Sequence, residues 1–374
     1  MSRARGKKLE DDFDESILAR LIVEHQQIKA EEEFTNDVGV LFCGMKKSGK
    51  TSLIDRFIKP EKDEKDQPKP TVALDYKFAR YASETSTSKV LAHIYDLGGD
   101  ENFEDLTRIA ASKTTVGNLV LAVTVDMSEP HLVVPSLEKW LQLLRQQVER
   151  SFQALAQESQ GGARRIEALQ KSRREAWEEH QDKAMVKPFP VPLVIFGTKC
   201  DMLLAETDPE KRKGLCRALR FFAHINGASL IFTSLRDKPS MNLMRAILRL
   251  LLFGVTSKGG IPEQLDPSKP ISIFAGKDNL QSIGLPHGAR ENTCEQAFRE
   301  MAAILFPDAE AGRRGGKRSE SEQVGDELLR FSESSIDGMV EQRQEELIQY
   351  RRQVERNQRL ASEGVDGTKI GVFG

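Results

Sequence analysis

The run GMKKSGKTSL, from Gly44 to Leu53, matches the phosphate-binding pattern G-x-x-x-x-G-K-[ST]. In such a loop, backbone N–H groups and the start of the next helix point at one place, where the helix dipole also favours negative charge. Lys50 would reach the outer phosphates of a nucleotide, and the Thr51 hydroxyl would hold Mg²⁺. With a glycine from a later motif, the residues predicted to contact phosphate are Gly44, Ser48, Gly49, Lys50, Thr51 and Gly99.

Two further motifs could complete a magnesium site. Thr71, in PKPTVALDY, stands where a mobile loop could bring a second hydroxyl to the ion. Asp96, in IYDLGG, ends an apolar run and is followed by two glycines. A carboxylate there holds Mg²⁺ through water, and a glycine N–H can meet the terminal phosphate. When a nucleotide is bound, we expect the metal to be held by Thr51, Thr71 and Asp96.

The motif FGTKCD predicts a binding site for the base. Its carboxylate, Asp201, could accept hydrogen bonds from N1 and N2 of guanine, and the stem of Lys199 could cover the ring. Ser234, which follows the run SLIFT, could close the pocket. The predicted base-binding residues are Thr198, Lys199, Asp201 and Ser234. Each motif ends a predicted strand, and ligands of open α/β sheets bind at that edge.

Other positions argue against efficient hydrolysis, so we assign no catalytic residue. Asp100 stands where active small GTPases normally have the glutamine that orients the attacking water. Lys46 and Lys47 occupy loop positions that are often glycine, and their bulk would crowd a transition state. No arginine can be assigned as a finger within the chain. We therefore favour a nucleotide that braces the fold over a hydrolytic switch.

The elements that must position these residues alternate between strand-like and helical runs, which is typical of a sheet with helices on both faces. The predicted fold is α/β: a P-loop GTPase-like, doubly wound, mostly parallel sheet with a helical insertion and helical N- and C-terminal extensions. The predicted strands are Val38–Cys43, Thr71–Ala79, Val90–Leu97, Leu119–Asp126, Val191–Gly197 and Ser229–Thr233, and a shorter strand-like run covers Ile271–Ala275.

The composition of successive segments predicts the organisation of the chain. Residues 1–35 form a charged amphipathic segment, and residues 36–256 form the Ras-like P-loop domain, with a helical insertion at 136–187 that Gly161 and Gly162 divide into two helices. Residues 257–307 pack on that domain. Residues 308–323 are polar and glycine-rich, as in a flexible linker. Residues 324–374 hold a helix, predicted over 326–360, and a tail; this helix either lies along a partner or is solvated.

Composition excludes several classes of protein. The net charge of −2 gives no case for nucleic-acid binding. No apolar run reaches the roughly 20 residues of a membrane span, and the basic start is followed by acidic residues, unlike a secretory signal. The four cysteines lie far apart, as free thiols in a reducing compartment do. The six histidines are also scattered, so the sequence predicts no zinc site.

Blocks of sequence spread from Val38 to Pro286 resemble the light intermediate chain family of cytoplasmic dynein 2. The similarity lies in LFCGMKKSGKTSL, PKPTVALDYKFAR, HIYDLGG, PFPVPLVIFGTKCD, KGLCRALRFFAHINGASLIFTS and SIFAGKDNLQSIGLP, which occur in the family's order. Generic Ras-like proteins carry neither the KPTxALDYxF block nor the FPVPLVIFGTKxD block. The dynein 1 light intermediate chains look less similar around Thr71.

The resemblance implies a non-catalytic subunit of a microtubule motor. Such a subunit uses its Ras-like domain to bind and stabilise the dynein 2 heavy-chain tail for retrograde intraflagellar transport and cilium assembly. Its other partners would be the dynein 2 intermediate and light chains and the intraflagellar transport trains. It would reside in the cytoplasm, the cilium or flagellum, the basal body and the cytoskeleton. The resemblance leaves open whether GTP or GDP with Mg²⁺ is bound, or no nucleotide.

Two alternatives come from other classes of protein. One is a small-GTPase-like switch that recruits effectors through residues 71–82 and 96–110, in which partner affinity depends on the nucleotide state. The other is an ATP-using enzyme such as a nucleotide kinase. The FGTKCD motif favours guanine, and no lid with clustered arginines is visible in the sequence, so we prefer the switch as the alternative.

Overall fold

The structure is a computed structural model of the whole chain. It describes residues 37–61, 68–82, 89–99, 101–158, 160–255, 262–286, 293–307, 339, 342–343 and 345–353. The chain divides into two compact units, Met1–Pro307 and Asp308–Gly374, which we treat separately. The predicted helix in residues 1–35, the side chain of Asp100, the linker 308–323 and much of the helix predicted over 326–360 lie outside the described residues.

Among the described residues, seven strands form one sheet in the order β2-β3-β1-β4-β5-β6-β7. The strands from β3 to β6 in this order are parallel, whereas β2 and β7 run antiparallel to their neighbours. The strands are β1 Val38–Gly44, β2 Leu74–Ala82, β3 Lys89–Leu97, β4 Leu119–Asp126, β5 Leu193–Thr198, β6 Ser229–Phe232 and β7 Ser272–Ile273. The predicted fold class is confirmed, and β7 falls in the shorter strand-like run.

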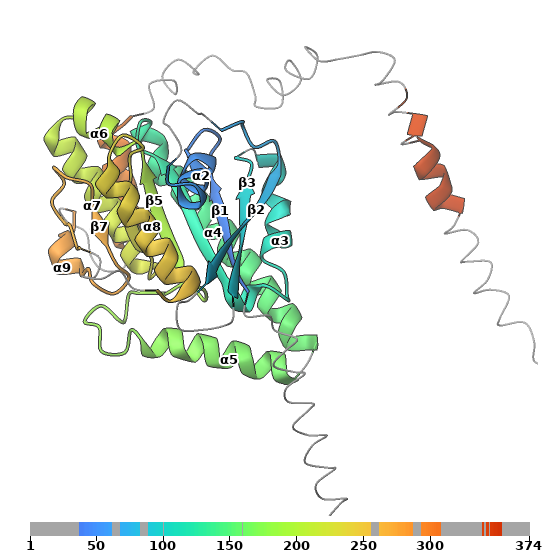
Figure 1. Cartoon of the computed structure of the whole chain (residues 1–374). Helices are drawn as coiled ribbons and strands as arrows, with labels where there is room; N and C mark the ends of the chain where they lie inside the picture. The colour runs from blue at the N-terminus through green and yellow to red at the C-terminus, as the bar shows by residue number, and fades with distance from the viewer. Residues whose placement is uncertain are drawn as a thin grey trace, which may run out of the picture. The chain divides into compact units, whose positions relative to one another are not determined.

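Helices cover both faces of the sheet (Figure 1). Helices α2 and α8 pack on one face, against a cluster that includes Val40 and Phe196. Helices α4, α7 and α10 pack on the other, against Leu121 and Ile195. The larger helices are α2 Lys50–Ile58, α4 Pro130–Glu158, α5 Gln160–Glu175, α7 Pro209–Ile225, α8 Lys238–Phe253 and α10 Cys294–Leu305. The shorter ones are η1 Glu101–Leu106, α3 Thr107–Ala110, η2 Val116–Asn118, α6 Cys200–Glu206 and α9 Leu280–Ile283.

The central strands β4 and β5 are apolar along most of their length, as strands with both faces buried require. In β4 and β5 almost every residue is buried, including positions that alternate between the two faces. Buried parallel strands read as continuous hydrophobic runs for this reason. The register places Leu41 beside Leu121, and Leu121 beside Leu193. This rigid centre carries the functional loops at the carboxyl ends of its strands.

Helices α4 and α5 fill the connection between β4 and β5 (Figure 1). The predicted apolar stripe of α4 is buried in the core at Leu137, Trp140, Leu141, Leu144, Val148 and Phe152. The insertion is divided into two helices, as predicted, but the division falls between Glu158 and Gln160, so Gly161 and Gly162 lie in the first turn of α5. A Cβ on Gly162 would lie 2.5 Å from Leu155 O, so glycine is what lets the two helices approach there.

The segment after α8 is held on the domain by strand pairing with β6 and by a buried ion pair with α7. Strand β7 pairs with β6. Arg220, on α7, donates hydrogen bonds of 2.8 and 2.7 Å to the two carboxylate oxygens of Asp278. Both side chains are buried, so each charge depends on the other for compensation. None of the described helices has the length and apolar character needed to cross a bilayer.

The second unit is described at residues 339, 342–343 and 345–353, all helical. The apolar side chains there are exposed: Met339, Leu347, Ile348 and Tyr350. Arg343 and Glu346 form an ion pair of 2.8 Å one turn apart. The exposed stripe agrees with both sequence hypotheses for this helix, a partner-bound segment and a solvated one.

Candidate nucleotide-binding site

The loop between β1 and α2 has the backbone conformation that its sequence predicts. Gly44 and Gly49 have φ values of 143° and 88°, in the region that favours glycine. A Cβ at Gly44 would also lie 2.3 Å from Thr124 O, so no larger residue fits there. Lys47 adopts a positive φ of 65° with a side chain present. The loop therefore has the tight turn from which backbone N–H groups can face a phosphate.

Lys50 is folded back over this loop. Its Nζ donates to Gly44 O at 2.9 Å and to Met45 O at 2.8 Å. The residue is 5% exposed, and burial lowers the pKa of its ammonium, although the nearby Asp96 opposes that effect. A buried cation at the first residue of α2 adds to the positive end of the helix dipole. The two together favour an anion at the loop.

Thr51, Thr71 and Asp96 meet although they come from three separate segments. Thr51 Oγ1 donates to Asp96 Oδ2 at 2.5 Å, and Thr71 Oγ1 donates to the same oxygen at 2.8 Å. The two hydroxyl oxygens are 3.0 Å apart. Burial raises the pKa of the Asp96 carboxyl, and the two hydroxyl donors oppose this. These three side chains are the ones predicted to hold Mg²⁺.

The donor set fits a magnesium ion. Hydroxyl, carboxylate and water oxygens are the ligands that Mg²⁺ prefers. Asp96 Oδ1 is buried, and among the described residues it has no hydrogen-bond partner. Such an atom is costly unless water or an ion satisfies it. Thr51, Thr71 and Asp96 are therefore the residues that would hold the metal, which when bound would neutralise phosphate charge.

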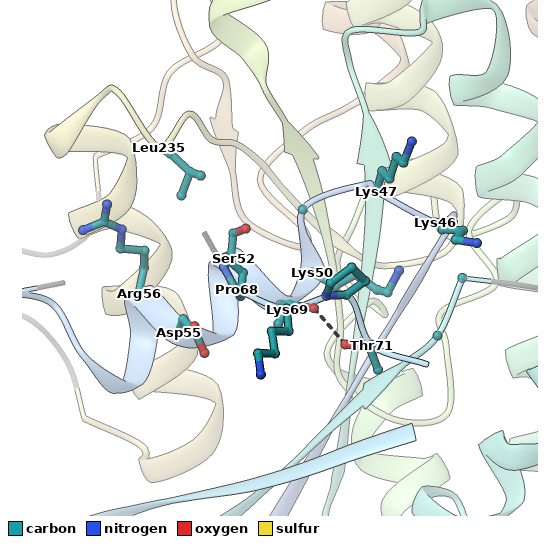
Figure 2. A pocket seen from close by; sticks show the side chains of 15 residues that line it. Lys46, Lys47, Lys50, Ser52, Asp55, Arg56, Pro68, Lys69, Thr71 and Leu235 are labelled. Atoms are coloured by element: carbon teal, nitrogen blue, oxygen red, sulfur yellow. Dashed lines mark hydrogen bonds between the residues drawn. The ribbon is translucent and has the colours of Figure 1, made fainter. Parts of the chain in front are cut away.

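A pocket of about 390 Å³ opens over the loop. Among the described residues that line it, five side chains are cationic, and the one carboxylate, Asp55, forms an ion pair of 2.9 Å with Lys77. Figure 2 shows Arg56 and Leu235 at one end of the pocket and Lys46 and Lys47 at the other. The cationic lining residues are Lys46, Lys47, Lys50, Arg56 and Lys69. Their excess positive charge favours a polyanionic ligand such as a nucleotide phosphate chain.

Gly98 and Gly99 bring the end of β3 against the phosphate loop. A Cβ on Gly99 would lie 2.0 Å from Lys46 N, so the two backbones are in direct contact. Both glycines line the pocket, as the prediction for Gly99 requires. The contact leaves Lys46, rather than a glycine, beside the place where a terminal phosphate would lie. The water-positioning role considered for Asp100 concerns a residue outside the described set.

Ser48 lies in the loop, but its side chain does not line the pocket. The residue is fully buried, and its hydroxyl is 2.7 Å from Thr124 Oγ1. Its backbone N–H donates to Met45 O at 3.2 Å. Ser48 thus links the loop to β4, and the structure gives its hydroxyl no direct access to phosphate. Gly44 and Asp96 do not line the pocket either.

The predicted base-binding residues gather at the ends of β5 and β6, next to the pocket. Thr198 Oγ1 lies 2.7 Å from Ser48 O, which joins this motif to the phosphate loop. Lys199, at a positive φ of 55°, forms an ion pair with Asp126. Asp201 lies 3.4 Å from the exposed guanidinium of Arg236. None of the four lines the pocket, which reaches this region only at Leu235.

Ser234 has a structural role at the turn before α8. Its hydroxyl accepts from Arg236 N at 3.2 Å, and its own N–H donates to Ser240 Oγ at 3.1 Å. The residue is 2% exposed. Four residues that contact the predicted site residues or line the pocket were not predicted from the sequence: Thr124, Asp126, Leu235 and Arg236. Only Asp126 had a signal in the sequence, because it is a carboxylate at the end of a predicted strand.

Comparisons with known proteins agree with this geometry. A family model described as Ras of Complex, Roc, domain of DAPkinase matches residues 39–158. A model described as Dynein light intermediate chain (DLIC) matches residues 164–303. The crystal structure of a dynein light intermediate chain's conserved domain aligns with a TM-score of 0.52 at 13% identity, covering 73% of this chain and 99% of that one. At that identity the likeness shows the fold.

Full-length relatives decide the family. A Danio rerio protein named cytoplasmic dynein 2 light intermediate chain 1 is 35% identical over 337 residues, which cover 87% of this chain and 89% of that protein. The chain belongs to the cytoplasmic dynein 2 light intermediate chain family. The Rattus norvegicus protein of the same name is 31% identical and covers 84% of the chain and 87% of itself. Membership of this dynein 2 light intermediate chain family confirms the resemblance predicted from the sequence blocks.

Proposed function

We propose that this chain is a non-catalytic subunit of cytoplasmic dynein 2 that binds and stabilises the tail of the motor's heavy chain. The observation that carries the proposal is the alignment with a dynein 2 light intermediate chain over 89% of that relative's length. A match of that extent spans the insertion and the segment after α8. The same subunit would serve retrograde intraflagellar transport and cilium assembly, in contact with the intermediate chains, light chains and transport trains.

In this proposal the nucleotide site stabilises the domain rather than driving the motor. The contacts of Lys50, Thr51 and Asp96 link the phosphate loop to α2 and β3. A bound GTP or GDP with Mg²⁺ would add contacts to the same elements, so it stabilises the folded state by mass action. Lys46 beside Gly99 and Asp100 after it in the sequence support weak or absent hydrolysis. Motor force would come from the heavy chain.

Co-expression with a dynein 2 heavy-chain tail tests the subunit role. We expect a stoichiometric complex that survives gel filtration, and a tail that is less soluble when expressed alone. A matched arm uses Lys50→Ala, which removes a phosphate contact and leaves the surface away from the pocket unchanged. Recovery of a soluble, stable tail without this chain, together with no co-elution, would contradict the proposal.

A nucleotide-dependent switch is the second candidate, and one observation favours it. Thr71 belongs to the segment before β2, yet its hydroxyl bonds Asp96 and approaches Thr51. A metal bound by these oxygens would couple the position of this segment to the nucleotide, as in switch loops. The two proposals differ in tail affinity for the GTP-loaded and GDP-loaded forms. A switch requires that the GTP-loaded and GDP-loaded forms bind the tail with different affinities, because a partner with equal affinity for two states does not change their populations.

A further inference from the structure

A second cluster of polar side chains lies in the connection between α5 and β5 and on the last turn of α7, away from the nucleotide pocket. His180 and Asp182 come from the connection, and His224 comes from α7. One ring nitrogen of each histidine and a carboxylate oxygen of Asp182 lie within 4.8 Å of one another. His224 Nε2 is 2.9 Å from Asp182 Oδ2, and His180 Nδ1 is 4.0 Å from the same oxygen.

The neighbours of the cluster orient its ligand atoms. His180 Nε2 is 3.0 Å from Asp278 O, a pure acceptor, so this nitrogen carries the proton and Nδ1 keeps its lone pair. The N–H of Leu280 donates to Asp182 Oδ2 at 2.9 Å. The N–H of Asp182 donates to the lone pair of His180 Nδ1 at 3.1 Å, and a metal ion at Nδ1 would have to replace this hydrogen bond. Metal-binding histidines are held in this way by backbone carbonyls behind them.

His224 leaves one atom unexplained. Its side chain is 1% exposed, and the nitrogen that faces the cluster is Nε2, which donates to Asp182 Oδ2 and would exchange that proton for the metal. The other nitrogen, Nδ1, is buried with no hydrogen-bond partner among the described residues. Trp177 packs against the rings of both histidines, at centroid distances of 5.0 and 5.7 Å. Burial lowers the pKa of His224, and the nearby Asp182 opposes this. A neutral, desolvated imidazole is the form that binds a transition metal.

We propose that His180, Asp182 and His224 form a binding site for a divalent transition metal ion with the ligand preferences of Zn²⁺. Two imidazoles and one carboxylate, completed by water, are a recurrent zinc ligand set. Zinc bonds of about 2.0–2.2 Å place two ligands of one tetrahedral ion about 3.3 Å apart. The observed separations of 2.9 and 4.0 Å lie on either side of that value, so small side-chain shifts complete the site.

The ion would join three segments that are distant in the sequence. It would link the connection before β5 to α7, and through His180 and Leu280 to the segment around Asp278. The site does not depend on the nucleotide pocket, and it does not rest on the subunit role proposed above. Its role would be to stabilise the face of the domain that α7 and α9 form.

Metal binding to the full, tag-free chain tests the proposal. The protein is stripped with chelator, dialysed and titrated with ZnCl₂ by calorimetry, with MgCl₂ as a separate arm. For the wild type we expect the titration to give one Zn²⁺ per chain and Zn²⁺ to raise Tm by several degrees. In the variants His224→Gln and Asp182→Asn, Zn²⁺ should not raise Tm. His131→Gln, on α4, is the matched control and should keep the full response. Each variant is compared with its own metal-free Tm, so lower stability alone does not mimic the result.

Cobalt provides a second readout that does not depend on stability. Co²⁺ in the site should give visible absorption bands that are lost in His224→Gln and kept in His131→Gln. Absence of a Zn²⁺-dependent rise in Tm in the wild-type chain would overturn the proposal, and the cluster would then be a set of structural hydrogen bonds without a metal. Equal binding by wild type and by both cluster variants would overturn it as well, because the ion would then be held elsewhere.

Discussion

Thr71 and Asp96 are joined by a hydrogen bond of 2.8 Å across the nucleotide site, from Thr71 Oγ1 to Asp96 Oδ2. The same carboxylate oxygen accepts from Thr51 at 2.5 Å. One oxygen of Asp96 thus holds together the first turn of α2, the segment before β2 and the end of β3. The other oxygen, Oδ1, is buried without a partner among the described residues. The magnesium-binding set is assembled within the fold, with one acceptor left to engage metal-bound water.

Asp96→Asn is predicted to stabilise the ligand-free protein and to weaken its response to nucleotide. Burial raises the pKa of Asp96, so the folded protein disfavours its ionised form at neutral pH. Asparagine removes that cost, and Tm at pH 7 should rise. The same change removes the charge that would hold Mg²⁺, so added GDP and Mg²⁺ should raise the Tm of the wild type more than that of the variant. Differential scanning fluorimetry measures both effects.

The stabilising effect of Asp96→Asn should depend on pH in a direction that follows from the raised pKa of Asp96. A carboxyl with a raised folded pKa contributes stability below its ordinary value, and this contribution is lost as pH rises through the folded value. The advantage of Asp96→Asn over the wild type should therefore shrink as pH falls from 7 towards the ordinary carboxyl range. An advantage that stays constant over this range would show that ionisation of Asp96 is not its cause.

Lys50→Ala is predicted to weaken nucleotide binding by at least about tenfold, because a charge-assisted hydrogen bond contributes roughly 1.5–3 kcal/mol. Titration with a fluorescent GDP analogue measures the change. Lys59→Ala is the control, since it removes one positive charge from an exposed residue just after α2. Equal loss in both variants would mean that Lys50 acts through general charge alone.

Gly99→Ala is predicted to destabilise the protein by about 1–3 kcal/mol, the usual cost of forcing extra atoms into a packed site. The added Cβ would lie 2.0 Å from Lys46 N, and backbone atoms there cannot move without distorting the loop. At Gly117 the atoms nearest to an added Cβ are those of the guanidinium end of Arg165, from 3.1 Å, and a flexible side chain can shift more easily than backbone. Urea denaturation should therefore separate Gly99→Ala from the milder Gly117→Ala; similar midpoints would argue against a tight contact at Lys46.

Arg220→Met is predicted to cost about 3–5 kcal/mol of unfolding free energy, because it leaves the charge of Asp278 buried and unpaired. The double variant Arg220→Met with Asp278→Leu should recover a large part of this loss, since neither charge then remains. A double-mutant cycle, built from the unfolding free energies of the wild type, the two single variants and the double variant in denaturant, measures the coupling between Arg220 and Asp278. Additive effects would show that the ion pair is not the unit of stability here.

The fold was predictable from the sequence because its strongest signals are local. A buried parallel strand is a continuous apolar run, and the phosphate loop sits between such a run and a helix with an apolar stripe. Strand β7 has only two residues, too few for a clear pattern, so its pairing was not predicted. The division of the insertion into two helices was predicted, but it falls at residues 158–160 rather than at Gly161 and Gly162, which begin α5 and let it approach Leu155.

The residues of the candidate sites divide in the same way, into those with a local signal in the sequence and those brought together only by tertiary packing. Lys50 and Thr51 follow from one motif, and the meeting of Thr71 with Asp96 follows from two further motifs that were predicted to hold the same metal. The pairing of Ser48 with Thr124 and the grouping of His180 with His224 join residues far apart in sequence, and of these four only Ser48 belongs to a motif. Such contacts depend on how the layers pack, which a single sequence does not specify.

The most direct test of the central claim is the affinity of this chain for a purified dynein 2 heavy-chain tail, measured by biolayer interferometry. Wild type and the double variant Lys50→Ala with Thr51→Asn should bind the tail with Kd values within about twofold of each other, since the nucleotide braces the fold and does not set the interface. Undetectable binding by a folded wild-type chain would contradict the subunit role, and loss of binding in the folded double variant alone would contradict the scaffold in favour of the switch.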